Sequence, residues 1–365
     1  MTIPDFADRK ACDTLVAAIS VEMARINRPV SLMEVCGTHT MNFFRYGLKP
    51  LFPKNLSILS GPGCPVCVTP DNEIDAIIAT ARLDHVTCAT FGDMIRVPGT
   101  VSSLEQEKTS GADIRIVYSP IEVLRIALAE PSRTVVFPAI GFETTTPLTA
   151  WIAREAKRRN VKNLRIFVFH KTILPAMELL LESGETRVDG FLCPGNVSAI
   201  TGWKMYLPLA AKHRKACVVT GFEPVDLLLG LLLLLRQISQ NRASVENEYS
   251  RAVTANGNTR CQAEITRVFS RTDATWRGLG TIPGSGLAFK PCYSFLDAKP
   301  LIAKSRLPKQ PAKTSCKCGD ILRGVLTPEK CPLFGAQCTP ESPKGPCMVS
   351  SEGTCAAHYR YKGAT

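Results

Sequence analysis

Short runs of aliphatic and β-branched residues alternate with longer amphipathic stretches from about residue 56 onward. The amphipathic stretches predict helices over residues 71–82, 120–130, 145–160 and 173–183. The apolar runs between them predict strands over residues 56–60, 85–90, 114–119, 134–140, 164–170, 188–193 and 216–220. Because strands and helices that alternate at this spacing are typical of βαβ units, we expect parallel sheets covered by helices.

Two strand-to-turn segments resemble one another and suggest a duplicated unit. Residues 135–143 and 217–223 each read as a strand that ends in Gly-Phe-Glu before a helix. The sequence therefore predicts two related Rossmann-like α/β domains with parallel sheets, followed by a mixed C-terminal domain. The expected division is an N-terminal segment 1–55, α/β domains 56–133 and 134–235, and a C-terminal domain 236–365.

Composition and charge narrow the class of protein. An apolar fraction of 45% and a charged fraction of 21% are ordinary for a folded, soluble chain. The longest apolar run, residues 227–235, is far shorter than the roughly 20 residues that span a bilayer, so we expect a buried helix and no membrane segment. The first residues lack the pattern of a secretory signal, and a cytoplasmic location is expected. The net charge of +12 is dispersed, without interleaved aromatic residues, so no nucleic-acid partner is expected.

The 15 cysteines favour metal or redox chemistry over structural disulfides in a reducing compartment. Cys36 opens the segment Cys-Gly-Thr-His-Thr, in which the imidazole of His39 would lower the pKa of an accessible thiol. A packed cysteine beside a hydrogen-bonded histidine fits the same spacing. The segment is therefore a candidate nucleophile or metal ligand.

The segment Gly61-Pro-Gly-Cys-Pro-Val-Cys is a more specific signal. It sets Cys64 and Cys67 in a glycine- and proline-rich loop between a predicted strand and a predicted helix. Such a loop holds two sulfurs within disulfide reach, and the following helix N-terminus stabilises a thiolate. Half of a zinc site is the alternative, but the chain has no second Cys-x-x-Cys to complete it.

The C-terminal tail is the most cysteine-rich part of the chain. Its six cysteines are Cys316, Cys318, Cys331, Cys338, Cys347 and Cys355. Four thiolates form the usual cage of an iron-sulfur cluster or of a structural zinc ion, and two sulfurs would then remain for redox chemistry. The pair Cys331-Pro332 is similar to the ligand segment of ferredoxins, while zinc stays the alternative occupant.

Two further turns carry polar or thiol side chains at predicted strand ends. Gly141-Phe-Glu-Thr-Thr-Thr presents the carboxylate of Glu143 and three hydroxyls, for which helix capping by threonine is the simplest interpretation. Cys193 begins the turn Cys-Pro-Gly-Asn-Val-Ser and is interpreted as the buried end of a strand. The cysteines interpreted as packing residues are Cys12, Cys88, Cys217, Cys261 and Cys292.

Taken in order, these segments resemble the HypD family of hydrogenase maturation proteins. The resemblance covers almost the whole chain and rests on the motifs that begin at Cys36, Gly61, Gly141 and Arg277-Gly-Leu-Gly and on the order of the tail cysteines. It implies a scaffold on which iron receives its cyanide and carbon monoxide ligands, the Fe(CN)2CO group of nickel-iron hydrogenases. It also implies a HypC-type chaperone and the cyanide donor HypE as partners and, indirectly, the hydrogenase large subunit.

The resemblance further implies roles for individual residues. Cys36 would hold the iron together with a cysteine of the chaperone, and soft thiolate donors suit such an electron-rich ferrous ion. Cys64 and Cys67 would form a redox pair, with His39 and Glu143 lining the site.

In the tail, the resemblance implies a 4Fe-4S cluster with four cysteine ligands. These ligands would be Cys316, Cys331, Cys338 and Cys355. Cys318 and Cys347 would then form a disulfide beside the cluster, in an arrangement similar to ferredoxin:thioredoxin reductase. Electrons would pass from the cluster to this disulfide and on towards Cys64 and Cys67.

One position departs from the family pattern, and two other functions fit the same residues. The family's turn usually reads Pro-Gly-His-Val-Ser, whereas this chain has Asn196 in place of the histidine. Asparagine hydrogen-bonds but takes up no proton, so an acid-base or metal role is not expected there. The alternative functions are an iron-sulfur dithiol oxidoreductase that binds iron incidentally and a zinc-stabilised adaptor for protein partners.

Overall fold

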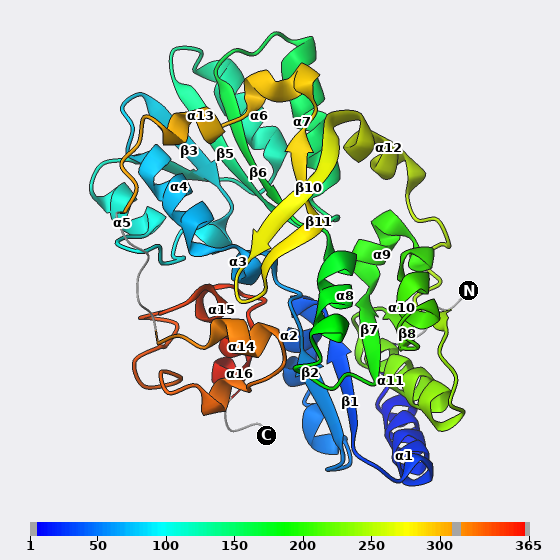
Figure 1. Cartoon of the computed structure of the whole chain (residues 1–365). Helices are drawn as coiled ribbons and strands as arrows, with labels where there is room; N and C mark the ends of the chain where they lie inside the picture. Colours follow the sequence, from blue (N-terminus) through cyan, green and yellow to red (C-terminus); the bar gives the residue numbers. More distant parts are fainter. Residues whose placement is uncertain (1–5, 309–314, 362–365) are drawn as a thin grey trace.

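The computed structural model describes residues 6–308 and 315–361 (Figure 1). Its β-strands form two parallel sheets and one antiparallel hairpin. The five-stranded sheet has the order β2 (Leu56–Ser60), β1 (Val30–Glu34), β7 (Gly190–Pro194), β8 (Ala216–Thr220) and β9 (Val245–Asn247). The four-stranded sheet has the order β4 (Asp113–Ile116), β3 (Val86–Thr90), β5 (Thr134–Gly141) and β6 (Leu164–His170). All neighbouring strands in both sheets are parallel, so the predicted α/β class is confirmed.

The two sheets draw their strands from both sides of the expected domain boundaries. β1 and β2 come from the first 60 residues, yet β1 pairs with β7 through Leu32 and Gly190. The four-stranded sheet joins β3 and β4 to β5 and β6. The expected ranges 56–133 and 134–235 therefore do not each hold one sheet. The reason is that parallel neighbours need a crossover, which lets strands far apart in sequence lie side by side.

Helices cover the sheets and enclose most of the core. The longer helices are α1 (Arg9–Ile26), α2 (Gly37–Arg45), α4 (Asp71–Ala81), α6 (Pro120–Ala129), α7 (Thr146–Arg158), α8 (Ile173–Ser183), α11 (Pro224–Ser239) and α12 (Thr259–Val268). α11 packs on β7 and β8 with α1 alongside it, and α4 and α6 pack on β3 and β5. The apolar run 227–235 lies inside α11, where most of its leucines are buried. In the described ranges we find no helix long and apolar enough to cross a membrane.

Short helices and 3-10 turns connect these elements and build the C-terminal region. The short α-helices are α3 (Pro65–Val68), α5 (Leu104–Thr109), α9 (Gly195–Thr201), α10 (Leu207–Ala211), α13 (Lys299–Ile302), α14 (Cys318–Leu322), α15 (Pro346–Val349) and α16 (Thr354–Arg360). The 3-10 turns are η1 (Lys49–Leu51), η2 (Gly92–Met94), η3 (Trp203–Tyr206), η4 (Pro291–Leu296) and η5 (Pro328–Lys330). α15 packs against α3, and α16 packs against α2. The cysteine-rich region therefore lies beside the two segments that carry Cys36 and Cys64 (Figure 1).

The hairpin, β10 (Phe269–Trp276) and β11 (Gly280–Phe289), was not predicted from the sequence. Its turn is the glycine-containing segment that begins at Arg277. A Cβ at Gly278 would lie 2.2 Å from the Cα of Gly319, so the absence of a side chain lets the turn touch α14. Arg277 meanwhile donates from its backbone to Val68 and pairs with Asp71 at 2.7 Å. The hairpin turn therefore links the C-terminal region to the segment that follows the Cys64 loop.

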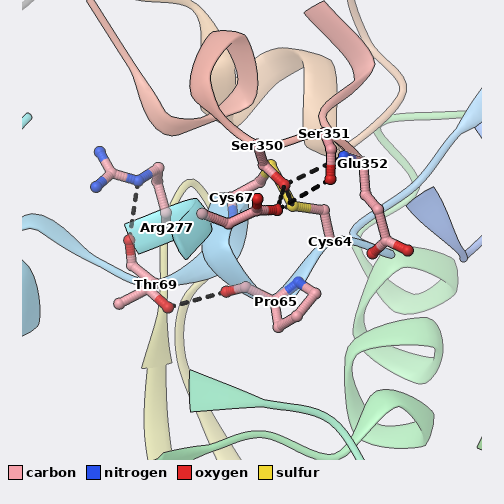
Figure 2. Close-up of a disulfide and its surroundings, with 9 residues drawn as sticks. Cys64, Pro65, Cys67, Thr69, Arg277, Ser350, Ser351 and Glu352 are labelled. Carbon is pink, nitrogen blue, oxygen red and sulfur yellow. Dashed lines mark hydrogen bonds between the residues drawn. A yellow bond between two sulfur atoms is a disulfide. The ribbon is translucent and has the colours of Figure 1, made fainter. Parts of the chain in front are cut away.

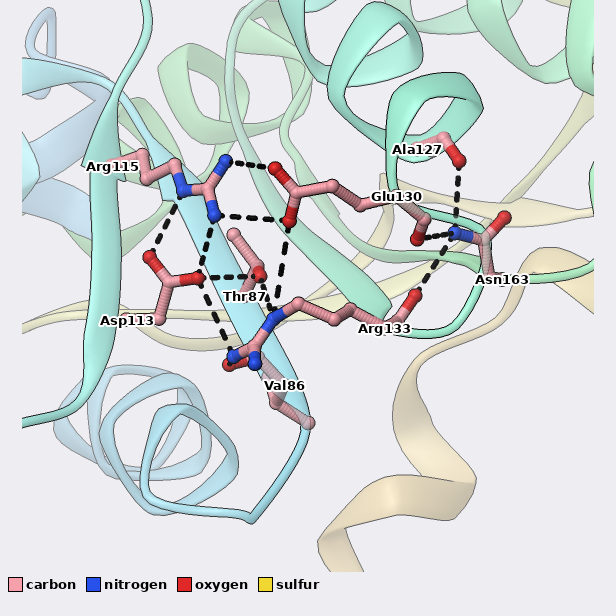
Figure 3. Close-up of polar contacts among 8 residues, drawn as sticks. All are labelled: Val86, Thr87, Asp113, Arg115, Ala127, Glu130, Arg133 and Asn163. Carbon is pink, nitrogen blue, oxygen red and sulfur yellow. Dashed lines mark hydrogen bonds and ion pairs between the residues drawn. The ribbon is translucent and has the colours of Figure 1, made fainter.

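A polar network joins the loops at the amino ends of the strands of the four-stranded sheet (Figure 3). The guanidinium of Arg115 pairs with Asp113 at 2.8 Å and with Glu130 at 2.5 Å. The side-chain amide of Asn163 donates to three backbone carbonyls around the ends of α6 and β5. These contacts fix loops at the amino ends of the strands, away from the edge where ligands bind to parallel sheets.

Candidate functional site: a thiol pocket at the carboxyl ends of both sheets

A pocket of about 470 Å³ lies where residues that follow strands of both sheets come together. The five-stranded sheet contributes residues after β1, β2 and β7, and the four-stranded sheet contributes residues after β3, β4 and β5. Its polar or reactive lining residues include Cys36, Asp93, Tyr118, Thr144, Asn196 and Glu352. This is the position at which parallel α/β sheets bind ligands.

Cys36 is the N-cap residue of α2, and its thiol lines the pocket. Its backbone N–H donates to Glu34 at 2.9 Å, and its Sγ lies 3.9 Å from Oδ1 of Asn196. Burial and, to a smaller extent, the nearby charge of Glu352 raise the pKa of Cys36 to about 12, against the lowering effect of the backbone N–H groups of His39 and Thr38. The thiol is therefore protonated at neutral pH unless a cation binds it.

Two glycines allow the Cys36 segment to pack tightly against its neighbours. A Cβ at Gly63 would lie 2.2 Å from the backbone nitrogen of Cys36. A Cβ at Gly37 would lie 2.4 Å from the carbonyl oxygen of Glu352. Because these two glycines have no side chain, the Cys64 loop and the C-terminal tail can both pack closely against the Cys36 segment.

Cys64 and Cys67 form a disulfide with a Cα–Cα distance of 5.2 Å (Figure 2). Both residues are buried, and the sulfur of Cys64 accepts a hydrogen bond from the backbone N–H of Cys67 at 3.2 Å. The hydroxyl oxygen of Ser350 lies 3.4 Å from this sulfur and is also 3.2 Å from Asp93. The pairing of the two sulfurs agrees with the Cys-x-x-Cys spacing, and their redox role stays a prediction.

His39 and Glu143 do not line the pocket of Cys36, contrary to expectation. The Nε2 of His39 lies 3.1 Å from the carbonyl oxygen of Gly221, and the ring contacts Phe222. Burial lowers the pKa of His39 to about 4, so the ring is neutral. Glu143 instead lines a separate pocket beside the hairpin. The physical reason is that residues 143–145 form a turn after β5, and this turn directs Glu143 towards the hairpin while Phe142 and Thr144 line the pocket of Cys36.

The six tail cysteines gather in one buried region. Five of them belong to the apolar core that also contains Cys64 and Cys67, and Cys316 packs against that core. Cys318 and Cys347 hydrogen-bond to each other, and Cys347 also interacts with Cys355. Cys318 and Cys347 are therefore in contact as two free thiols, and not as the expected disulfide.

The surroundings of the four expected cluster ligands fit a thiolate-bound cluster. The backbone N–H of Lys344 donates to the sulfur of Cys338 at 3.3 Å, and such bonds stabilise cluster sulfurs. A Cβ at Gly345 would lie 2.8 Å from the sulfur of Cys316, so this glycine leaves room beside it. Within residues 6–308 and 315–361, no group of three or more His, Cys, Asp or Glu side chains is placed so that it could hold a single metal ion. A cluster binds each thiolate through a different iron, so its ligands need not converge in this way.

Several residues of the pocket were not found from the sequence. Asp93, in η2, and Glu352, in the tail, line the pocket, and Ser350 contacts Asp93 and the sulfur of Cys64 beside it. Glu352 accepts a hydrogen bond from Thr38 at 2.6 Å. Asp93 follows a predicted strand end, which is a usable signal, whereas nothing in the sequence around Ser350 marks it as part of a site.

These features define a class of protein, an α/β protein with a buried thiol at the junction of two parallel sheets and a cysteine-rich region beside it. A family model named HypD, described as "Hydrogenase formation hypA family", matches residues 10–362. The chain therefore belongs to the HypD family.

The most similar relatives include proteins of three bacteria. The chain is 45% identical over 365 residues to Hydrogenase maturation factor HypD2 of Bradyrhizobium diazoefficiens, and the matched region covers 98% of this chain and 96% of the relative. It is 47% identical over 342 residues to Hydrogenase maturation factor HypD of Rhizobium leguminosarum bv. viciae, with 92% and 89% covered. It is 44% identical over 337 residues to Hydrogenase maturation factor HypD of Escherichia coli, with 92% and 90% covered.

Proposed function

We propose that this protein serves hydrogenase maturation as the scaffold on which an iron ion receives cyanide and carbon monoxide. The observation that carries the proposal is the position of Cys36. Its thiol lines a pocket between two sheets, and the loop of the Cys64–Cys67 disulfide packs directly against its backbone. The fold thus holds the thiol of Cys36 next to the Cys64–Cys67 disulfide, and this proximity supports the proposal.

Iron is the substrate of this site, and Cys36 is its ligand from this chain. A thiol with a pKa of about 12 binds a ferrous ion by losing its proton, because the cation compensates the buried thiolate. The N–H groups of Thr38 and His39 at the start of α2 stabilise the same negative charge. A HypC-type chaperone provides a second thiolate ligand to the iron from the open side of the pocket.

The Cys64 and Cys67 pair supplies electrons when cyanide arrives as a protein thiocyanate on HypE. The S–CN bond breaks with two electrons, so the carrier becomes a thiol and cyanide is released. The two thiols of Cys64 and Cys67 provide those electrons and become the disulfide; of their two protons, one goes to the carrier sulfur and one to solvent. The disulfide form of this pair is the oxidised end of that step.

The tail restores the dithiol. A 4Fe-4S cluster would be held by Cys316, Cys331, Cys338 and Cys355. When reduced by an external one-electron donor, such a cluster would supply the two electrons of a disulfide reduction one at a time, with the two protons taken from solvent. Cys318 and Cys347 are in contact, and α15, which carries Cys347, packs against α3, which carries Cys67. Thiol exchange between the two pairs would therefore take place between adjacent helices.

Asn196 takes the place of the family's usual histidine near the iron site. Its Oδ1 accepts from the backbone N–H of Val197 at 2.8 Å and lies 3.9 Å from the sulfur of Cys36. The side chain therefore orients the thiol by hydrogen bonding and exchanges no proton with it.

Replacing Cys36 by serine tests the proposal. The protein is purified anaerobically with a HypC-type chaperone, and the cyanide and carbonyl stretching bands of bound iron are recorded by infrared spectroscopy. We expect the bands to disappear in Cys36→Ser and to persist in the exposed control Cys292→Ser. Bands that survive in Cys36→Ser would favour the dithiol oxidoreductase, for which iron binding is incidental.

The same preparation distinguishes the scaffold function from that of a zinc-stabilised adaptor. A thiolate-bound iron-sulfur cluster colours the protein brown. A colourless protein with stoichiometric zinc would contradict the cluster assignment.

A further inference from the structure

A second pocket, of about 520 Å³, lies beside the hairpin and has no lining residue in common with the pocket of Cys36. It is enclosed by the start of α8, the segment from α9 to η3, helix α12 and both strands of the hairpin. Its volume is within the range of pockets that bind small molecules. The proposed iron chemistry uses none of its residues.

Two buried side chains of this pocket each have a polar atom without a hydrogen-bond partner among the described residues. Glu143 and Thr172 each expose 8% of their surface, and both line the pocket. One carboxyl oxygen of Glu143 accepts from the backbone N–H of Ile173 at 3.1 Å. The other oxygen, and the hydroxyl of Thr172, have no partner among the described residues. Because a buried polar group without a partner is costly, their presence on one pocket wall points to a ligand that completes them.

A positive charge faces this carboxyl group without neutralising it. Arg271, on β10, lines the same pocket and lies close enough to lower the pKa of Glu143, which burial raises to about 7. Among residues 6–308 and 315–361, the side chain of Arg271 has no hydrogen bond or ion pair. An acid and a guanidinium thus belong to one pocket and interact through space without a direct contact.

The rest of the pocket lining combines apolar side chains with polar ones, among them Thr201, Gln262 and Lys290. Its apolar side chains include Leu174, Met205, Ile265, Phe269 and Leu287. Apolar contacts of this kind provide most of the binding energy in small-molecule sites, while a few polar groups fix the orientation.

We propose that this pocket binds a small zwitterion, namely an amino acid with an apolar side chain. Its ammonium group donates to Glu143 and Thr172, its carboxylate binds Arg271, and its side chain packs on the apolar side chains of the lining. The carboxyl of Glu143 presents either oxygen to the ligand by rotation about its last torsion, which is soft and two-fold. Both charges of the ligand are needed, because each protein charge is left without a partner otherwise.

Binding of three matched probes to the full-length protein tests this assignment. The probes are L-leucine, isoamylamine, which keeps the ammonium group and the apolar body, and 4-methylpentanoate, which keeps the carboxylate and the apolar body. Titration calorimetry and ligand-observed NMR should show leucine bound at least about tenfold more tightly than either half-molecule, which corresponds to about 1.4 kcal/mol.

Three variants locate the binding in this pocket. Glu143→Gln and Arg271→Gln should each weaken leucine binding at least about tenfold, because each removes one charge-assisted hydrogen bond. Arg267→Gln is the matched control, since Arg267 is exposed on the neighbouring α12 and does not line the pocket. Should Glu143→Gln fail to fold, Arg271→Gln decides alone, because Arg271 is exposed.

The proposal is overturned by any of three results. These are no leucine binding at millimolar concentration, equal binding of leucine and a half-molecule, and unchanged leucine binding in both Glu143→Gln and Arg271→Gln. Adenosine monophosphate serves as a fourth probe, and its binding in place of leucine would assign the pocket to nucleotides instead. All of these measurements are independent of iron and of the proposed scaffold role.

Discussion

Gly63→Ala should separate the Cys64 loop from Cys36, although it adds a single methyl group. The new Cβ would lie 2.2 Å from the backbone nitrogen of Cys36 and 2.3 Å from the carbonyl carbon of Val35. These are backbone atoms, so no side-chain rotation relieves the contact. The Cβ is about 1.2 Å short of the 3.4 Å at which ordinary contact begins, and the two segments must move apart by about that distance.

The magnitude of the effect follows from this displacement. Overpacking costs about 1–3 kcal/mol, and the movement also threatens the hydrogen bond of 3.2 Å from the N–H of Gly37 to the carbonyl of Gly63. We therefore expect a loss of about 2–4 kcal/mol in the free energy of unfolding. A shift of about 1 Å between reacting groups costs roughly a hundredfold in rate, so cyanide- and carbonyl-bound iron should form more slowly by about that factor.

The assay combines denaturant melts with infrared spectroscopy of the complex with a HypC-type chaperone. Gly92→Ala is the matched control, because Gly92 lines the same pocket and its Cβ would meet its nearest atom at an ordinary 3.7 Å. A Gly63→Ala protein as stable and as well loaded as Gly92→Ala would refute the argument that the loop and Cys36 must touch.

Three further substitutions give distinct outcomes. Burial raises the pKa of Glu143 from 4.5 to about 7, so the folded chain binds more protons than the unfolded chain between these pH values. As the pH rises through this window, the free energy of unfolding of wild type should therefore fall by up to about 3 kcal/mol relative to that of Glu143→Gln in denaturant melts. Lys171→Met should destabilise the fold by about 3–5 kcal/mol in the same melts, because it leaves the carboxylate of Glu73 without the ammonium 3.1 Å away. Gly345→Ala should lower the iron content and visible absorbance of anaerobically purified protein, because its Cβ would lie 2.8 Å from the sulfur of Cys316.

Each of these predictions has its own contrary result. Parallel stability curves for Glu143→Gln and wild type would show that this carboxyl group titrates normally in the folded state. The double variant Lys171→Met with Glu73→Gln should regain most of the lost stability, and failure to regain it would argue against the ion pair. Unchanged iron content in Gly345→Ala, measured beside Gly92→Ala, would show that this glycine is not needed next to Cys316.

Most strands of the two sheets could be predicted because strands of parallel sheets are buried on both faces and read as apolar runs. β3 and β8, for example, are buried at every residue. β1 was missed because it ends in Glu34, a buried carboxyl group that interrupts the apolar pattern. β9 is a three-residue edge strand without such a pattern. The pairing of β1 with β7 depends on contacts between distant segments, which no local pattern contains.

The candidate site was predictable where its chemistry is local in sequence. The spacing of Cys64 and Cys67 determines their distance, so the disulfide geometry could be foreseen. The direction in which a side chain points after a strand is not local, and Glu143 accordingly lies in a pocket other than the expected one. Glu352 reaches Cys36 only through the fold of the C-terminal region, since more than 300 residues separate them.

The central claim is that Cys36 holds the iron being assembled while the tail holds a separate cluster. Mössbauer spectroscopy of isotopically enriched protein, co-purified anaerobically with a HypC-type chaperone, tests this claim most directly. Wild type should show two iron environments, a low-spin ferrous site and a 4Fe-4S cluster, and Cys36→Ser should retain the cluster signal alone. A low-spin ferrous signal that persists in Cys36→Ser, or a cluster signal that disappears with it, would contradict the account.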